Sequence, residues 1–255
     1  MKPLTPEQQA QLQKQIEAHK EIIDGTGEGY VVYIHLGFED FEFAVYIYEG
    51  VMRADQMTSA YLARYLSWNN ELYAGKTAID MGCGCGLLGL VMARYGAERV
   101  IMSDISPEAV KNTKDNLRMW KGSEQRYIKD TYEPVKGGLL IKYLCEVVQG
   151  DLFENINEKA DLIVFNHPFF DGYSSEAPFS MASKGDTLER FLEQAKDYLF
   201  EDNSRIIMPF YHVAPEDNDP GIQGPKHGYK VKTMRHFDAK KGMQQGPVSI
   251  YELSK

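Results

Sequence analysis

Three alternate glycines between two short apolar runs constrain the fold of this chain more than any other feature. Residues 78–81 lead into glycines at 82, 84 and 86, and a second apolar run closes on Asp104. The apolar stretch 87–93 between them has helical spacing, so residues 77–104 predict a strand, a tight turn, a helix and a second strand. Glycine has no Cβ, so its backbone turns sharply and approaches a ligand closely. An acidic residue at the second strand tip suits two ribose hydroxyls, which indicates a nucleoside cofactor.

Two nucleoside cofactors fit this pattern. Gly84, Gly86 and Gly89, followed by Asp104, satisfy the glycine fingerprint of NAD-binding folds. However, Asp80 ends the first strand just before the glycines, where its carboxylate would repel a pyrophosphate. The same carboxylate could bind the cationic amino group of a methionine moiety. The sequence therefore favours S-adenosylmethionine and leaves NAD as the alternative.

Polar residues also follow two later apolar runs. Gly150 and Asp151 end one of them, and Asp151 with Leu152 is expected to lie beside the adenine amino group. The tetrad Asn166-His167-Pro168-Phe169 directly follows the buried run 162–165. Asn-His-Pro after a strand is also a common turn composition, but its place in a cofactor-binding fold favours a functional role.

Together these motifs resemble the class I S-adenosylmethionine-dependent methyltransferases, specifically the group that carries Asn-Pro-Pro-Phe/Tyr and methylates amino or amide nitrogen. The resemblance covers residues 50–211. It implies an α/β fold with a Rossmann-like, mostly parallel sheet that ends in an antiparallel C-terminal hairpin. The predicted cofactor-binding residues are Asp80, Gly82, Cys83, Gly84, Gly86, Asp104, Ile105, Asp151, Leu152 and Asn166.

The resemblance makes Asn166, His167, Pro168 and Phe169 the predicted catalytic residues. Methyl transfer from a sulfonium requires a nitrogen lone pair held in line with the reacting carbon. The Asn166 amide oxygen and the His167 carbonyl can accept both N–H groups of a planar substrate, which Phe169 can stack against. Pro168 biases His167 towards an extended backbone. The family has proline at 167, so histidine there loses rigidity and gains a ring that could accept a proton.

The methyl acceptor stays open at this level. Residues 166–172 look like the Asn-Pro-Pro-Phe-x-x-Gly of rRNA guanine-amino methyltransferases, whereas the preceding stretch with the tetrad is also similar to release-factor and ribosomal-protein glutamine methyltransferases. A net charge of −9 favours a protein or small-molecule acceptor over RNA. From Lys226 onwards the chain carries +5, against −14 in the remainder, which keeps RNA possible. Two hypotheses of another class stay open beside the methyltransferase, namely an NAD-linked oxidoreductase and a catalytically silent scaffold of the methyltransferase fold.

The first fifty residues predict an accessory module, with the methyltransferase domain at 51–255. Thr5, Pro6 and Gln8 are typical of a helix start with a capping box, and residues 30–36 and 41–48 predict a hairpin. In the family, the stretch before the core offers polar side chains to the methionine end of the cofactor. That implies such a role for Arg53, Gln56 or Thr58, although Thr58 or Ser59 could equally cap the next helix.

The remaining chain predicts the rest of the sheet. Ser106-Pro107 starts a helix, residues 121–138 predict an exposed insertion, and residues 188–199 form an amphipathic helix. The further strands are predicted at 144–148, 162–165, 205–211, 229–237 and 248–253.

Composition limits the setting of the protein. Three cysteines, an odd number, argue against a disulfide framework and favour a reducing cytoplasm. The N-terminus has no apolar signal-peptide core, and no apolar run is long enough for a bilayer. We predict no metal, since Cys83 and Cys85 lack an accompanying ligand cluster. The oligomeric state stays open.

Overall fold

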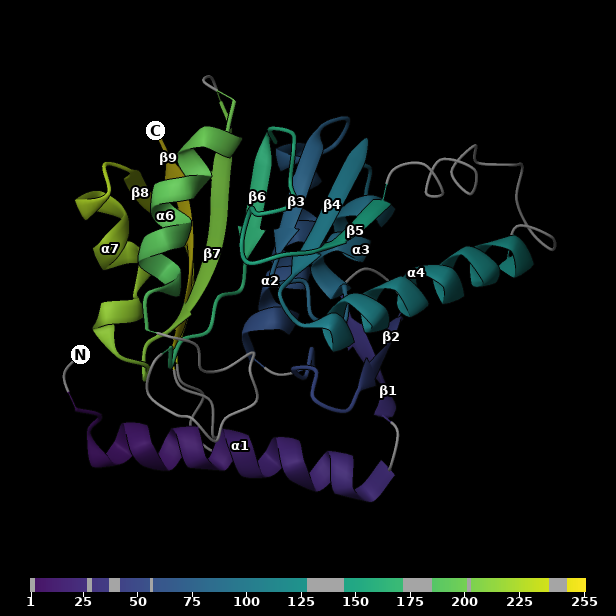
Figure 1. The fold of residues 1–255 in the computed structure, drawn as a ribbon, viewed down its shortest axis with the longest axis horizontal. Helices are drawn as coiled ribbons and strands as arrows, with labels where there is room; N and C mark the ends of the chain where they lie inside the picture. The colour runs from purple at the N-terminus through teal and green to yellow at the C-terminus, as the bar shows by residue number, and fades with distance from the viewer. Residues whose placement is uncertain are drawn as a thin grey trace.

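The computed structural model describes residues 3–26, 29–36, 42–55, 57–127, 145–171, 185–200, 203–238 and 247–255. Its centre is one sheet of strand order β5-β4-β3-β6-β7-β9-β8 (Figure 1). The strands are β3 (Thr77–Met81), β4 (Arg99–Asp104), β5 (Cys145–Gln149), β6 (Leu162–Phe165), β7 (Arg205–Tyr211), β8 (Lys230–Phe237) and β9 (Val248–Ser254). Strands β3 to β7 pair in parallel, and β9 pairs antiparallel with both β7 and β8. This confirms the predicted fold class.

Both faces of the sheet are buried, as successive residues of β3 illustrate. Ala78 packs into the cluster beneath α2 (Met57–Trp68), α3 (Leu87–Arg94) and α4 (Pro107–Tyr127). Ile79 packs on the opposite face, in the cluster beneath α6 (Thr187–Tyr198). Burial of a large aliphatic side chain such as that of Ile79 contributes about 1.5–3 kcal/mol. The parallel strands are therefore fixed from both sides, and their ends can carry a precisely placed site.

The glycine turn between β3 and α3 requires glycine. Gly82, Gly84 and Gly86 have φ angles of 62°, 57° and 85°, a region that residues with a Cβ rarely adopt. A Cβ on Gly86 would also lie 2.9 Å from Cγ2 of Thr113 on α4. The predicted strand, turn, helix and strand of residues 77–104 are confirmed.

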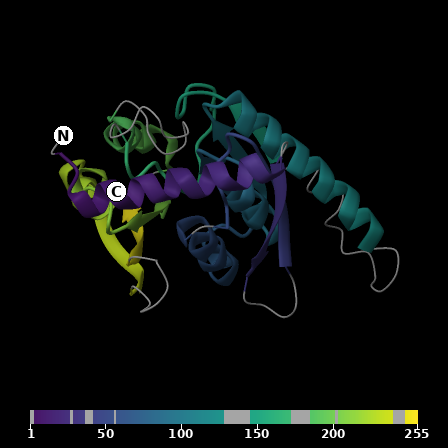
Figure 2. The same cartoon turned by 90° about the horizontal axis from the view of Figure 1, so that it is seen from below.

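The N-terminal segment forms a long helix and a two-stranded sheet. In α1 (Pro6–Thr26), Thr5 and Gln8 make the predicted reciprocal capping box, with N···O distances of 2.9 and 3.2 Å. Strands β1 (Gly29–His35) and β2 (Glu42–Tyr48) pair antiparallel. The buried side chains of this hairpin join the cluster beneath α2 to α4. Helix α1 crosses the end of the molecule where the parallel strands terminate (Figures 1 and 2). The division at residue 50 stays a prediction.

Two segments differ from the sequence prediction. The insertion predicted at 121–138 was wrong in its first part, because α4 continues to Tyr127. Residues 121–127 are rich in strong helix formers, which extend a helix already started at Pro107. Residues 128–144 lie outside the described ranges. The short helices η1 (Asn70–Leu72), η2 (Glu216–Asn218) and α7 (Pro220–Lys226) were not predicted.

Helix α7 was missed because its sequence contains two prolines and two glycines. It begins nevertheless with Pro220 at its first position, and the Asp219 side chain caps it by accepting the Gly221 N–H at 2.7 Å. Within the described ranges, no helix has the length and apolar character needed to span a membrane.

Candidate active site

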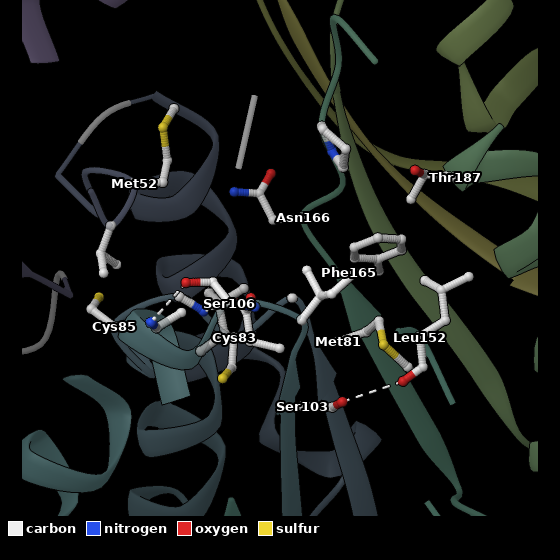
Figure 3. A pocket seen from close by; sticks show the side chains of 18 of the residues that line it. Met52, Met81, Cys83, Cys85, Ser103, Ser106, Leu152, Phe165, Asn166 and Thr187 are labelled. Carbon is white, nitrogen blue, oxygen red and sulfur yellow. Dashed lines mark hydrogen bonds between the residues drawn. The ribbon is translucent and has the colours of Figure 1, made fainter. Parts of the chain in front are cut away.

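A cavity of about 440 Å³ opens at the carboxyl ends of β3, β4 and β6 (Figure 3). Ligands bind at this edge of open parallel sheets. The lining residues are Gly50, Val51, Met52, Ala54, Ser59, Met81, Gly82, Cys83, Gly84, Cys85, Leu87, Leu88, Ser103, Asp104, Ile105, Ser106, Ala109, Gly150, Asp151, Leu152, Phe165, Asn166, Pro168, Thr187 and Arg190.

Most of the predicted residues meet at this cavity. Those that line it are Gly82, Cys83, Gly84, Asp104, Ile105, Asp151, Leu152, Asn166 and Pro168. Four predicted residues do not belong to its lining, namely Asp80, Gly86, His167 and Phe169. Most of the residues predicted from the sequence thus lie together at one cavity. Of the four exceptions, Asp80 and His167 have buried side chains, and Gly86 faces Thr113 of α4.

Asp104 is held rigidly at the tip of β4. Its Oδ2 accepts the Gly84 N–H at 2.8 Å, and its Oδ1 accepts the Ser106 N–H at 3.0 Å. Burial raises the pKa of this carboxyl, and the N–H donors oppose that shift. The Ile105 N–H also acts on this carboxylate. A carboxylate has about four lone-pair positions, so acceptor capacity remains for a ligand hydroxyl.

Asp151 forms a bidentate ion pair with Arg190 of α6. Its two carboxylate oxygens lie 2.9 and 3.2 Å from the guanidinium nitrogens, and both residues line the cavity. The next residue, Leu152, has a φ of 54°, and its carbonyl accepts the Ser103 hydroxyl at 3.2 Å (Figure 3). Sequence reasoning missed Arg190, because only the docking of α6 brings it to the end of β5.

Asn166 lines the cavity and carries a buried acceptor without a partner among the described residues. Its Nδ2 donates to Ser59 Oγ of α2 at 2.8 Å, which fixes the amide plane. Its Oδ1 is buried and has no hydrogen-bond partner within the described part of the chain. Such an orphaned acceptor costs about 1–3 kcal/mol. A ligand N–H would satisfy it, so the site fits a nitrogen-bearing substrate.

The His167 ring lies away from the cavity. It is 2% exposed, and its Nε2 donates to the Asn218 carbonyl of η2 at 2.8 Å. The Asn218 amide donates in turn to the Phe169 carbonyl at 3.0 Å, so η2 holds the tetrad at two points. The Phe169 ring packs edge-on against His167 and Phe210, with centroid distances of 5.0 and 5.8 Å.

Burial lowers the pKa of His167 to about 4, while the hydrogen bond to Asn218 opposes the shift. We therefore expect the ring to stay neutral at about pH 5, where an ordinary histidine is protonated. Imidazole ¹⁵N shifts, assigned by comparison with His167→Gln, would report this between about pH 8 and about pH 5. A ring that titrates near 6.5 would contradict the buried placement.

Asp80 lies behind the glycine turn and is 1% exposed. Its Oδ2 accepts the Gly89 N–H at 2.7 Å, whereas its Oδ1 has no partner within the described residues. Burial raises the pKa of this carboxyl to about 7, and the Gly89 N–H opposes the shift. The sequence predicted that Asp80 binds the cationic amino group of the methionine moiety. Because Asp80 does not line the cavity, its carboxylate would have to attract that group through the glycine turn.

The raised pKa predicts a pH-dependent stability. The contribution of Asp80 is fully present below the unfolded pKa of about 4 and is lost as pH rises through about 7. Asp80→Asn keeps an acceptor for the Gly89 N–H and removes the buried charge. We expect the melting temperature of Asp80→Asn, relative to that of wild type, to be higher at about pH 8 than at about pH 5. Thermal melts without ligand would measure this difference in melting temperature. An equal difference at both pH values would refute the prediction.

The cavity-lining residues just before and at the start of α2 differ from those predicted. Arg53 forms an ion pair with Asp55 at 2.7 Å and does not belong to the cavity lining, nor does Thr58. Gln56 lies outside the described residues. Met52 and Ser59 line the cavity instead. Because α2 begins at Met57, Thr58 and Ser59 lie within its first turn rather than capping it.

Cys83 and Cys85 line the cavity as small buried side chains. Burial raises the pKa of the Cys85 thiol to about 12 and that of Cys83 well above its ordinary value, so both stay protonated. Among the residues that the structure describes, no cluster of three His, Cys, Asp or Glu side chains could hold a metal ion.

Comparisons with known proteins match this geometry. Residues 43–141 match the family model described as methyltransferase small domain. The chain is 49% identical over 61 residues to a ribosomal protein L11 methyltransferase of Alteromonas mediterranea, covering 24% of this chain and 20% of the relative. It is 26% identical over 182 residues to a release factor glutamine methyltransferase of Borreliella burgdorferi, covering 71% of this chain and 54% of the relative. The chain thus spans only part of the length of these relatives.

A solved structure also shares the fold. A 16S rRNA N2 methyltransferase of T. thermophilus, in complex with AdoMet and guanosine, aligns with a TM-score of 0.58 at 16% identity. The alignment covers 89% of this chain and 50% of that one. The chain therefore has the fold of the class I S-adenosylmethionine-dependent methyltransferases, and its residues 43–141 are similar to the methyltransferase small domain.

Proposed function

We propose that this chain is an S-adenosylmethionine-dependent N-methyltransferase that acts on a planar amide or amino nitrogen. The observation that carries the proposal is the orphaned Oδ1 of Asn166 at the cavity, with its amide plane fixed by Ser59. A buried acceptor without a partner marks the place where a substrate N–H is expected.

The cavity residues suit S-adenosylmethionine better than NAD. Asp104 would accept the ribose hydroxyls, Asp151 and Leu152 would lie at the adenine, and the glycine turn would border the methionine moiety. The bound cofactor supplies a methyl group already activated by its sulfonium. When ionised, the buried Asp80 carboxyl behind the turn would favour a cationic ligand over a pyrophosphate. The relatives named above are also methyltransferases.

The chain itself holds and polarises the acceptor nitrogen. The Asn166 Oδ1 and the His167 carbonyl would each accept one N–H, which favours positive charge as it develops at nitrogen. Asn218 holds the chain on the His167 side of this contact, because it bonds the His167 ring and the Phe169 carbonyl. The rigidity that proline would give at 167 is thus replaced by a buried hydrogen bond.

A protein glutamine or a small molecule is the favoured acceptor. The net charge of −9 opposes long-range attraction to RNA, and one relative is named a release factor glutamine methyltransferase. An rRNA guanine-amino group is the second candidate. It is supported by exposed basic residues at and beside the edge strand β8, namely Lys226, Lys230, Lys232 and Arg235. RNA binding through such residues should weaken steeply with salt.

Labelled S-adenosylmethionine in a lysate from cells lacking this protein tests the proposal. Adding the purified chain should label a protease-sensitive or small-molecule product, and Asn166→Ala should not. Ribonuclease-sensitive label would select the RNA candidate. Cofactor binding without any labelled product would contradict the proposed activity and favour the silent scaffold.

A further inference from the structure

We propose that Thr113 and Asn116 of α4 are positioning residues for the glycine turn, and that Asn116 couples the β1–β2 hairpin to it. This inference rests on the proposed cofactor site. The turn lies between β3 and α3, and one side of it lines the cavity. The opposite side packs against α4, where Asn112, Thr113 and Asn116 are each at most 1% exposed.

The two backbone carbonyls at the tip of the turn bind α4. Thr113 Oγ1 donates to the Gly84 carbonyl at 2.8 Å, and Asn116 Nδ2 donates to the Cys85 carbonyl at 2.8 Å. These bonds fix the planes of two successive peptides. Since Gly84 and Cys85 also line the cavity, the orientation of these planes determines the surface that a ligand meets. The close approach of Gly86 to Thr113 shows how tightly the turn lies on this helix.

Asn116 also closes the edge of the hairpin. Its Oδ1 accepts the Tyr46 N–H at 2.9 Å, and its Nδ2 donates to the Tyr46 carbonyl at 2.7 Å. One buried amide therefore binds β2 and the glycine turn together. An accessory strand and the cofactor turn, far apart in sequence, share a single side chain whose displacement would move both.

Asn112 provides a matched control on the same helix face. One turn before Asn116 and equally buried, it accepts the Tyr48 N–H at 3.0 Å and donates to the Tyr46 carbonyl at 2.8 Å. Within the described residues, its hydrogen bonds reach only the hairpin. Thr113 is the reverse case, since its bonds reach the turn and not the hairpin.

Three variants separate the two roles. Thr113→Val changes only the contact with the turn and nearly preserves shape, Asn112→Ala changes only the hairpin, and Asn116→Ala changes both. We expect S-adenosylmethionine affinity, measured by calorimetry, to fall about tenfold in Asn116→Ala and several-fold in Thr113→Val. Asn112→Ala should bind as wild type does while its melting temperature falls.

Amide hydrogen exchange gives a second measurement that general destabilisation would not reproduce. Amides of the turn and the first turn of α3 should exchange faster in Thr113→Val and Asn116→Ala than in Asn112→Ala. Equal affinities in all three variants would overturn the inference, as would a loss in Asn112→Ala matching that in Asn116→Ala. If Asn116→Ala does not fold, the comparison of Thr113→Val with Asn112→Ala still decides whether α4 positions the glycine turn. Wild type that binds no S-adenosylmethionine would instead refute the proposed function.

Discussion

Asn166→Ala is expected to reduce methyl transfer by about 100- to 1,000-fold, the effect of removing one preorganised polar group that stabilises a transition state. The variant removes the buried Oδ1 acceptor, which has no partner among the described residues. Affinity for S-adenosylmethionine should stay near that of wild type, because the residues proposed to bind the ribose and the adenine lie at the ends of other strands. The labelled-lysate assay measures the rate, and calorimetry measures the affinity.

Ser59→Ala is the graded control for this prediction. It leaves the Asn166 side chain in place but removes the hydroxyl that accepts from Nδ2 at 2.8 Å. The rate should therefore fall less than in Asn166→Ala, because the acceptor is still present but less firmly oriented. Full activity in Asn166→Ala would move the reacting site elsewhere in the molecule.

Asp104→Ala should weaken S-adenosylmethionine binding by about 1.5–3 kcal/mol, which is a factor of about 10 to 150. The carboxylate has acceptor capacity left for a ribose hydroxyl, and its bonds to the Gly84 and Ser106 N–H groups fix its orientation. The dissociation constant measured by calorimetry tests this directly. An unchanged constant would rule out the ribose contact.

Asp161→Ala is the matched control for Asp104→Ala. Asp161 also accepts a backbone N–H, that of Thr77 at 3.0 Å, but this bond lies at the opposite ends of β3 and β6. Both variants should lose thermal stability through the lost backbone contact. Only Asp104→Ala should lose affinity, so a parallel loss in both would assign the effect to folding.

Periodic burial and turn chemistry made most of the fold predictable. The alternation on β2 and the apolar run of β6 each specify one packing arrangement, and the glycines of the turn mark the positive φ angles observed there. Helix α7 was not predictable in this way. Its internal glycines and proline oppose a helix, which the Asp219 cap and packing against β7, β8, β9 and α6 stabilise.

The site was predictable where a residue directly follows a strand, as Asp104 and Asn166 do. It was not predictable where function depends on a partner distant in sequence. Ser59 matters because α2 brings it to Asn166, and Arg190 because α6 brings it to Asp151. His167 also follows β6, but its ring donates a hydrogen bond to the Asn218 carbonyl of η2 and lies away from the cavity.

A calorimetric titration of the purified chain with S-adenosylmethionine and, separately, with NAD tests the central claim most directly. We predict saturable binding of S-adenosylmethionine at one site per chain, weakened in Asp104→Ala, and no measurable heat with NAD. Binding of NAD without binding of S-adenosylmethionine would contradict the account.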